Sequence, residues 1–109
     1  IAYLTDDGRA LAYAIFSGLG EHKAELSVWS SDLRGCGGRA FLRAVFRTAF
    51  VQWRLKRLSA FIRVSNRRSH DAARDLGFIP EATVQRWFGD EDGVLYLMFP
   101  EHCRWLGKE

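Results

Sequence analysis

The sequence of 109 residues has little cysteine, no long apolar run and few lysines, and the first two shortages argue against a metal site and against a membrane-spanning helix. The 2 cysteines, Cys36 and Cys103, are far apart and have no metal-ligand spacing, so we expect two free thiols and no metal. No apolar run approaches the roughly 18 residues of a membrane helix, and nothing resembles a signal peptide. We therefore expect a cytoplasmic protein without a membrane segment.

The composition predicts one packed domain, because 48% of the residues are hydrophobic and 14% are aromatic. The net charge of +3 comes from 13 arginines and 3 lysines against 13 acidic residues, a bias toward the side chain that binds phosphate with a planar fork. Nucleic acid is the usual partner of a basic domain. However, Phe46, Phe50 and Trp53 fall mostly on the apolar side of a helix rather than among arginines, which disfavours a base-stacking platform.

A glycine-rich segment between an extended stretch and an amphipathic helix is the strongest motif. Its residues are Arg34, Gly35, Cys36, Gly37, Gly38 and Arg39. Three glycines let backbone N–H groups close on an anion, and the following helix presents its positive N-terminus to the same place. The segment predicts a phosphate site, although a connection of this kind that binds nothing is about as common when the loop stands alone.

Hydrophobic periodicity predicts an alternation of strands and helices. We expect strands at 1–5, 10–17, 23–30, 58–64, 78–88 and 94–99, and helices at 39–54 and 67–76. The strand at 10–17 has almost no polar alternation and should be buried on both faces. The last two strands should be joined by a turn at 90–93. This order predicts an α/β fold, a mixed, mostly antiparallel sheet with helices on its faces.

The two helices carry further signals. Arg39, Arg43 and Arg47 form a basic stripe on the first helix, which we interpret as a solvated face except for Arg39 at the loop. Asn66 is a good N-cap for the second helix, and Gly77 suits the left-handed residue that ends it.

The glycine loop, the Asn66-Arg67-Arg68-Ser69 helix start and the Leu76-Gly77-Phe78 helix end together resemble the Gcn5-related N-acetyltransferase (GNAT) superfamily over nearly the whole chain. The tail at 101–106 is similar to that of phage- and plasmid-type members. A complete domain of this kind carries one strand and two helices ahead of the part present here. The resemblance therefore implies that residues 1–109 form one domain that is N-terminally incomplete, or one whose missing wall a partner supplies.

The resemblance implies an acetyl-CoA-dependent N-acetyltransferase, in which a primary amine of a protein N-terminus, a lysine or a small molecule attacks the thioester directly. The glycine loop would hold the pyrophosphate; Arg34 and Gly37 match the family pattern, whereas Arg39 replaces a small residue. By the same resemblance, acetyl-CoA would also be bound by the strand end Ser27, Val28 and Trp29, by Asn66 and by Ser69.

The sequence offers several candidates for the groups that transfer protons. Ala73 occupies the position of the family's acidic tyrosine, so water or Tyr96 would have to protonate the leaving thiolate. Glu25 is our candidate general base and Glu21 the second choice, while a carboxylate on a solvent face is the ordinary alternative. The histidines form no cluster in the sequence, and we expect each at the surface.

The alternative to catalysis is a non-catalytic GNAT-like module that binds a CoA derivative or another protein, an interpretation favoured by Ala73 and Arg39. A homodimer through 94–99 and Trp105 is a further expectation; a core strand is the alternative for the same residues.

Overall fold

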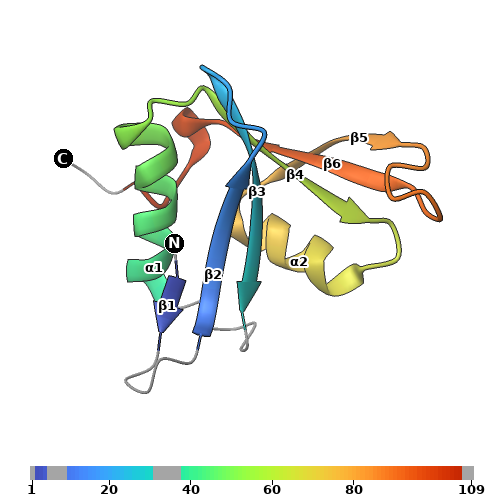
Figure 1. Cartoon of the computed structure of the whole chain (residues 1–109), viewed down its shortest axis with the longest axis horizontal. Coiled ribbons are helices and arrows are strands. Elements are labelled where there is room, and N and C mark those ends of the chain that lie inside the picture. The colour runs from blue at the N-terminus through green and yellow to red at the C-terminus, as the bar shows by residue number, and fades with distance from the viewer. Residues whose placement is uncertain (1, 5–9, 31–37, 107–109) are drawn as a thin grey trace.

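The computed structural model describes residues 2–4, 10–30 and 38–106, which form six strands and two α-helices (Figure 1). The strands are β1 Ala2–Leu4, β2 Ala10–Ser17, β3 Lys23–Ser30, β4 Arg57–Arg63, β5 Ile79–Val84 and β6 Gly93–Met98. The helices are α1 Gly38–Arg47 and α2 Arg67–Leu76, with a π-helical turn at Thr48–Gln52 and a 3-10 turn at Pro100–His102. Between the predicted strands at 1–5 and 10–17, the sequence Asp6-Asp7-Gly8 indicates a hairpin turn, which lies outside the described residues.

All six strands belong to one sheet in the order β1-β2-β3-β4-β6-β5. Neighbouring strands are antiparallel except β3 and β4, which α1 connects as a parallel pair. The mixed, mostly antiparallel sheet expected from the sequence is therefore confirmed. Because β6 lies between β4 and β5, the 94–99 strand is internal to the sheet.

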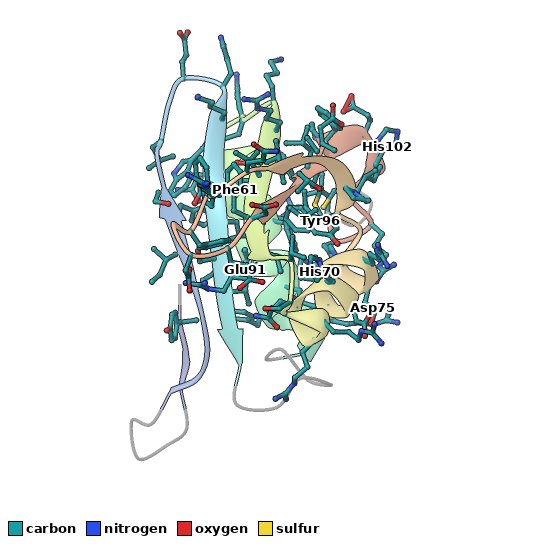
Figure 2. The ribbon with its side chains drawn as sticks, turned by 90° about the vertical axis from the view of Figure 1, so that its right-hand side faces the viewer. Phe61, His70, Asp75, Glu91, Tyr96 and His102 are labelled. Atoms are coloured by element: carbon teal, nitrogen blue, oxygen red, sulfur yellow. The ribbon has the colours of Figure 1, made fainter. Side chains whose placement is uncertain are left out.

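Both helices pack on the same face of the sheet (Figure 2). That face supplies Leu26, Leu58 and Tyr96 to one continuous core, and α1 supplies Phe46 while α2 supplies Ala73. We call this side of the sheet the helix face. The other side is the open face, because no described helix covers it.

The first helix is shorter than its predicted range of 39–54. Its apolar side is buried as expected, with Val45 and Phe46 fully inaccessible to solvent. After Arg47 the backbone widens into the π-helical turn, which shifts the register of the side chains. Trp53 therefore lies half-exposed beside the core and meets the edge of the Phe16 ring at a centroid distance of 4.9 Å.

The prediction that the 10–17 strand is buried on both faces is wrong. Ala14 faces the core, whereas Tyr13 and Ile15 point to the open face, where Ile15 is 53% exposed. The strand lies next to the edge strand β1 rather than at the centre, so its apolar alternate positions have no helix against them.

The predicted boundaries at the end of the chain also change. The fifth strand ends at Val84 rather than Phe88, and Gly93 is paired within β6 rather than in a turn. The residues between them, 85–92, form a longer connection in which Arg86 N–H donates to the Asp92 carboxylate at 2.8 Å. This side-chain-to-backbone bond competes with strand pairing, which is why the apolar residues of this stretch do not extend the strand.

Candidate active site

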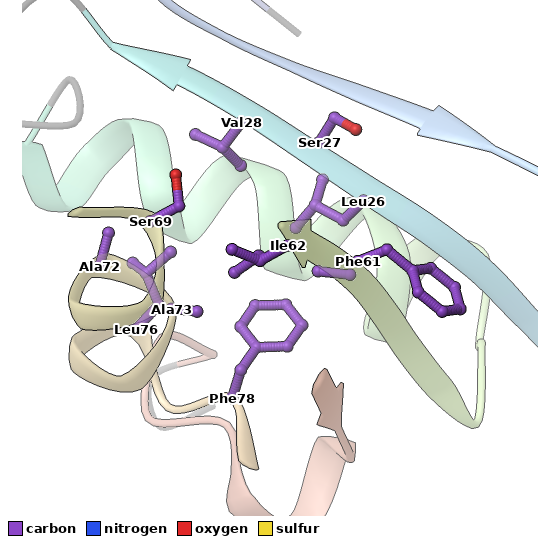
Figure 3. Close-up of a pocket in the computed structure, with 11 residues that line it drawn as sticks. Leu26, Ser27, Val28, Phe61, Ile62, Ser69, Ala72, Ala73, Leu76 and Phe78 are labelled. Carbon is purple, nitrogen blue, oxygen red and sulfur yellow. The ribbon is translucent and has the colours of Figure 1, made fainter. Parts of the chain in front are cut away.

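The parallel strands β3 and β4 separate partway along their length. Their pairing covers only Lys23–Glu25 against Arg57–Ser59, after which the two strands diverge (Figure 3). β3 remains bonded to β2, and β4 remains bonded to β6, so the sheet stays intact on either side of the separation. The result is a gap in the middle of the sheet that is bordered by backbone on both sides.

A pocket of about 190 Å³ occupies this gap and extends to α2; we call it the gap pocket. It is lined by Leu26, Ser27, Val28, Ala60, Phe61, Ile62, Ser69, Ala72, Ala73, Leu76 and Phe78. The lining is apolar apart from two hydroxyl groups, and small side chains of α2 leave the space open. Such a slot fits a slender chain with few charges.

The start of α2 is fixed by a side-chain cap. The Ser69 N–H donates to Asn66 Oδ1 at 3.2 Å, so Asn66 is the N-cap that the sequence predicted. Gly77 ends the helix at φ 110°, which confirms the predicted left-handed residue. Ser69, Ala72 and Ala73 then lie on the side of α2 that faces the gap pocket (Figure 3).

The predicted acetyl-CoA residues are brought together in part. Ser27 and Val28 line the gap pocket with Ser69, and the backbone of Trp29 continues along β3. Asn66 caps α2 one helical turn before Ser69. The loop residues Arg34, Gly35, Cys36 and Gly37 lie outside the described residues, whereas Gly38 and Arg39 begin α1.

Arg39 lines a second hollow, about 270 Å³ in volume, that we call the arginine cleft. Its other walls are Arg43, Arg104 and Trp105. Arg104 lies over the Trp105 ring with its guanidinium carbon 4.7 Å from the ring centroid, and Trp105 Nε1–H donates to the Leu76 carbonyl at 2.8 Å. The sequence indicated a binding role for Arg39 only. Arg104 and Trp105 come from the end of the chain, and only folding brings them next to Arg39.

Tyr96 does not reach the gap pocket. It is 1% exposed, and its hydroxyl lies 2.8 Å from His70 Nδ1 (Figure 2). The His70 Nε2–H donates to the carbonyl of Arg63 at 2.9 Å, so in the neutral ring Nδ1 accepts from Tyr96. His70 is therefore partly buried, and it links α2 to the sheet rather than lying free at the surface as expected. The sequence feature that could have indicated this contact is its position one helical turn after the N-cap Asn66.

Glu25 lies at the inner end of the gap, where the β3–β4 pairing stops, and its side chain is on the open face. It is half-buried and is the last paired residue of β3 opposite Ser59. Glu21, the second choice for a base, lies in the turn before β3, with its carboxylate 3.9 Å from the His22 ring. Among the described residues, Glu25 is thus the carboxylate that stands beside the gap.

The connection at 85–92 is bonded to the end of β4 on the open face. Arg63 Nη1 donates to Asp90 at 2.9 Å, and the Ser65 N–H donates to Glu91 at 2.6 Å. The Arg63 guanidinium holds the pKa of Asp90 below its usual range, and hydrogen bonds from Ser65 lower the pKa of Glu91. These bonds fix the connection against the sheet.

Metal-ligating groups and membrane-spanning helices are both missing from the part of the chain that the structure describes. No three His, Cys, Asp or Glu side chains gather there in a way that could hold a metal ion, and no helix there is long and apolar enough to cross a membrane. Cys103 is a free thiol whose pKa is raised by burial.

Known structures identify the fold. No protein-family model matches the sequence, and no curated protein matches it. A GNAT-family acetyltransferase from Bacillus anthracis is similar over 88% of this chain and 62% of its own, with TM-score 0.71 and 18% identity. Ribosomal-protein-S5-alanine acetyltransferase from Vibrio fischeri is similar over 92% of this chain and 58% of its own, with TM-score 0.73 and 18% identity.

A third similar structure contains a form of coenzyme A. Mycobacterium smegmatis RimJ, in complex with CoA-disulfide, is similar over 87% of this chain and 50% of its own, with TM-score 0.68 and 24% identity. The chain therefore has a GNAT-like fold and spans between half and two thirds of the length of these three acetyltransferases. The fold implied by the sequence resemblance is confirmed, while the narrower likeness to phage- and plasmid-type members and the incomplete N-terminus stay predictions.

Proposed function

We propose that this chain is an acetyl-CoA-dependent N-acetyltransferase that transfers an acetyl group to a primary amine. The observation that carries the proposal is the gap between β3 and β4, which opens a narrow apolar pocket beside unpaired strand backbone. A thioester placed there would have its carbonyl next to backbone N–H groups of β3, the donors that stabilise a developing oxyanion.

The acyl donor would enter from the helix face. Its pantetheine arm fits the slot along Ser69 and Ala72, and its phosphates would lie at the glycine loop and the N-terminus of α1, where the helix dipole favours negative charge. Arg39 and Arg43 in the arginine cleft extend the positive surface from that helix end. Binding through backbone N–H groups explains how Arg39 can replace a small residue in the loop motif.

Glu25 is proposed as the general base. It would accept a proton from the attacking ammonium, directly or through one water, because it stands where the gap begins. The lining of the gap pocket contains no titratable side chain, so the leaving thiolate would take its proton from water. An alkyl thiol has a pKa of about 8.5, and a thiolate of that basicity leaves without a strong acid nearby.

The proposal is tested by calorimetric titration of acetyl-CoA into the 109-residue chain and into Ala72→Trp, whose indole would fill the gap pocket. We expect micromolar binding by the wild type and a loss of at least about 100-fold in the variant, because a filled slot excludes the pantetheine arm. Asp75→Trp, on the exposed side of the same helix, is the matched control and should bind as the wild type does. Gly37→Asp should abolish binding separately, through charge repulsion of the pyrophosphate.

The second candidate is a module that binds a CoA derivative without turnover, and Ala73 in place of the expected acid favours it. Release of free CoA thiol in the presence of primary amines separates the two: binding without release would identify the non-catalytic module. No acetyl-CoA binding by the wild type would reject the enzyme and would leave a GNAT-like module that binds another protein. We also propose that the enzyme acts in the cytoplasm and forms a homodimer.

A further inference from the structure

A third pocket, about 290 Å³ in volume, lies on the open face of the sheet, and we call it the Glu25 pocket. Glu25 and Ser59, the last residues that pair before β3 and β4 separate, are part of its lining. Leu95 and Leu97 of β6 form part of its apolar floor. The pocket combines a few charged groups, one carboxylate and two cations, with apolar surface, which is the composition of a small-molecule site.

One end of the Glu25 pocket is an aromatic wall. The Trp87 ring stacks on Phe61 with a centroid distance of 3.8 Å and an interplanar angle of 11°. Gly93 makes the stack possible, since a Cβ there would lie 2.9 Å from the Trp87 Cβ. The bond between Arg63 and Asp90 holds the same connection in place, so the wall exists before any ligand binds.

The Glu25 pocket and the gap pocket meet at Phe61, which lines both. Figure 3 shows the Phe61 ring pointing away from Ser69 and Ala72, toward the opposite side of β4. If the acyl donor fills the helix face of the gap, the amine has to approach the thioester from the open face. The carboxylate of Glu25 then stands on the side from which the amine arrives.

The charges of the Glu25 pocket are ordered along the strands. The register places Lys23 beside Arg57 and Glu25 beside Ser59. Residues two apart on a strand have Cα atoms about 7 Å apart on the same face, so Lys23 lies about that far along β3 from Glu25. Arg57 lies beside Lys23 on β4, and both cations are on the side of Glu25 away from the gap. From the gap outward, the pocket thus presents an aromatic wall, a carboxylate and two cations.

We infer that the Glu25 pocket receives the acyl acceptor and that this acceptor is a primary amine bearing an anionic group about 7 Å or more from its nitrogen. This inference rests on the proposed function. The amine lies between Glu25 and the gap, its apolar chain lies on the floor of the pocket, and its carboxylate or phosphate pairs with Arg57 and Lys23. In the reaction Glu25 receives one proton of the ammonium group, and the free amine nitrogen then forms a bond to the acetyl carbon. The carbon–sulfur bond breaks with its electron pair on sulfur, and the second proton that the nitrogen loses on becoming an amide passes through water to the thiolate.

The test compares two amines of equal length and opposite charge at the far end, 6-aminohexanoate and 1,6-diaminohexane. The ends of 6-aminohexanoate are about 7 Å apart when extended. The ratio of their kcat/KM values, measured by release of CoA thiol, should favour the aminocarboxylate by about fivefold or more in the wild type, the size of effect that an exposed ion pair reaches. Arg57→Glu should change this ratio by about tenfold toward the diamine, because attraction becomes repulsion.

Lys56→Glu is the matched control, since it changes the charge equally at the adjacent residue but does not line the pocket. Its ratio should equal that of the wild type. A change of less than about twofold in Arg57→Glu, or the same change in Lys56→Glu, would overturn the inference. A preference for the diamine in the wild type would do so as well.

Binding of 6-aminohexanoate, followed by calorimetry with desulfo-CoA present, keeps the inference testable if turnover is absent. Binding that Arg57→Glu weakens and Lys56→Glu retains would support the pocket even if the proposed catalysis failed. Thiol release with other amines but no binding of 6-aminohexanoate would retain the proposed function and reject the acceptor class.

Discussion

The helix face and the open face of the sheet are built from the same strands but differ in what their apolar residues do. On the helix face, both helices cover the sheet and form one core with it. On the open face, apolar residues such as Ile15 and Ile79 are half-exposed, and the larger ones cluster around a carboxylate. Among the described residues, the packing that stabilises the fold therefore resides mainly on the helix face.

The largest expected effect contrasts the two faces directly. Phe46→Ala should lower the free energy of unfolding by about 3–5 kcal/mol, because Phe46 is fully buried between α1 and the sheet. Ile15→Ala on the open face should cost less than about 1 kcal/mol. Urea denaturation of both variants measures the difference. Equal losses would mean that the open face is covered in solution and that the two faces do not differ as described.

Glu25→Gln tests a residue that lies where the gap connects the two faces, and it should affect the acetyl-transfer step without affecting acetyl-CoA binding. We expect kcat to fall by about 100-fold or more, the usual contribution of a general base, while acetyl-CoA affinity stays the same. Glu21→Gln should remain within about twofold of the wild type, since its carboxylate lies in the turn before β3 rather than beside the gap. Similar losses in both variants would argue against Glu25 as the base.

Tyr96→Phe probes the polar link between α2 and the sheet on the helix face. The variant leaves His70 Nδ1 without its donor, so we expect a loss of about 1–2 kcal/mol in the free energy of unfolding. A double-mutant cycle with His70→Ala should show a coupling energy near about 1 kcal/mol. If the losses of unfolding free energy in the two single variants simply add in the double variant, the Tyr96–His70 hydrogen bond contributes no stability.

The smallest expected effect concerns the connection on the open face. The pKa values of Asp90 and Glu91 are lowered in the folded chain from 3.8 and 4.5, so the unfolded chain takes up protons first as the pH falls. The stability that these groups contribute is fully present above about pH 4.5 and is lost below it. Unfolding curves between about pH 5 and pH 3 should therefore show a decline that is shallower in Glu91→Gln. An unchanged decline would place the acid sensitivity elsewhere.

Much of the fold could be predicted from the sequence because its signals are local. The period of the α1 residues, the Asn66 cap and the Gly77 stop are each set within a few residues, and all three are confirmed. The burial of the 10–17 strand could not be predicted, because apolar composition does not reveal which face a helix covers. The extent of the last strands escaped prediction because the Arg86–Asp92 and Arg63–Asp90 bonds are not visible as a pattern.

The candidate site divides in the same way. Ser27, Val28 and Ser69 were predicted through the family resemblance and lie together in the gap pocket. Trp87 and Arg57 could not be predicted, because each joins Glu25 only through pairing between distant strands. Arg104 could not be predicted either, because it lines the arginine cleft with Arg39 and Arg43 only after the end of the chain packs beside α1. Whether the glycine loop binds phosphate stays a prediction.

The early end of the β3–β4 pairing also has a consequence for hydrogen exchange. Amide groups of residues 26–30 that point into the gap face no neighbouring strand, although they belong to the middle of a sheet. They should exchange with deuterated solvent much faster than the amides of β4 that pair with β6. An extended ligand bound in the gap would accept hydrogen bonds from these amides and slow their exchange. Hydrogen exchange of residues 26–30 would therefore measure ligand binding without any labelled ligand.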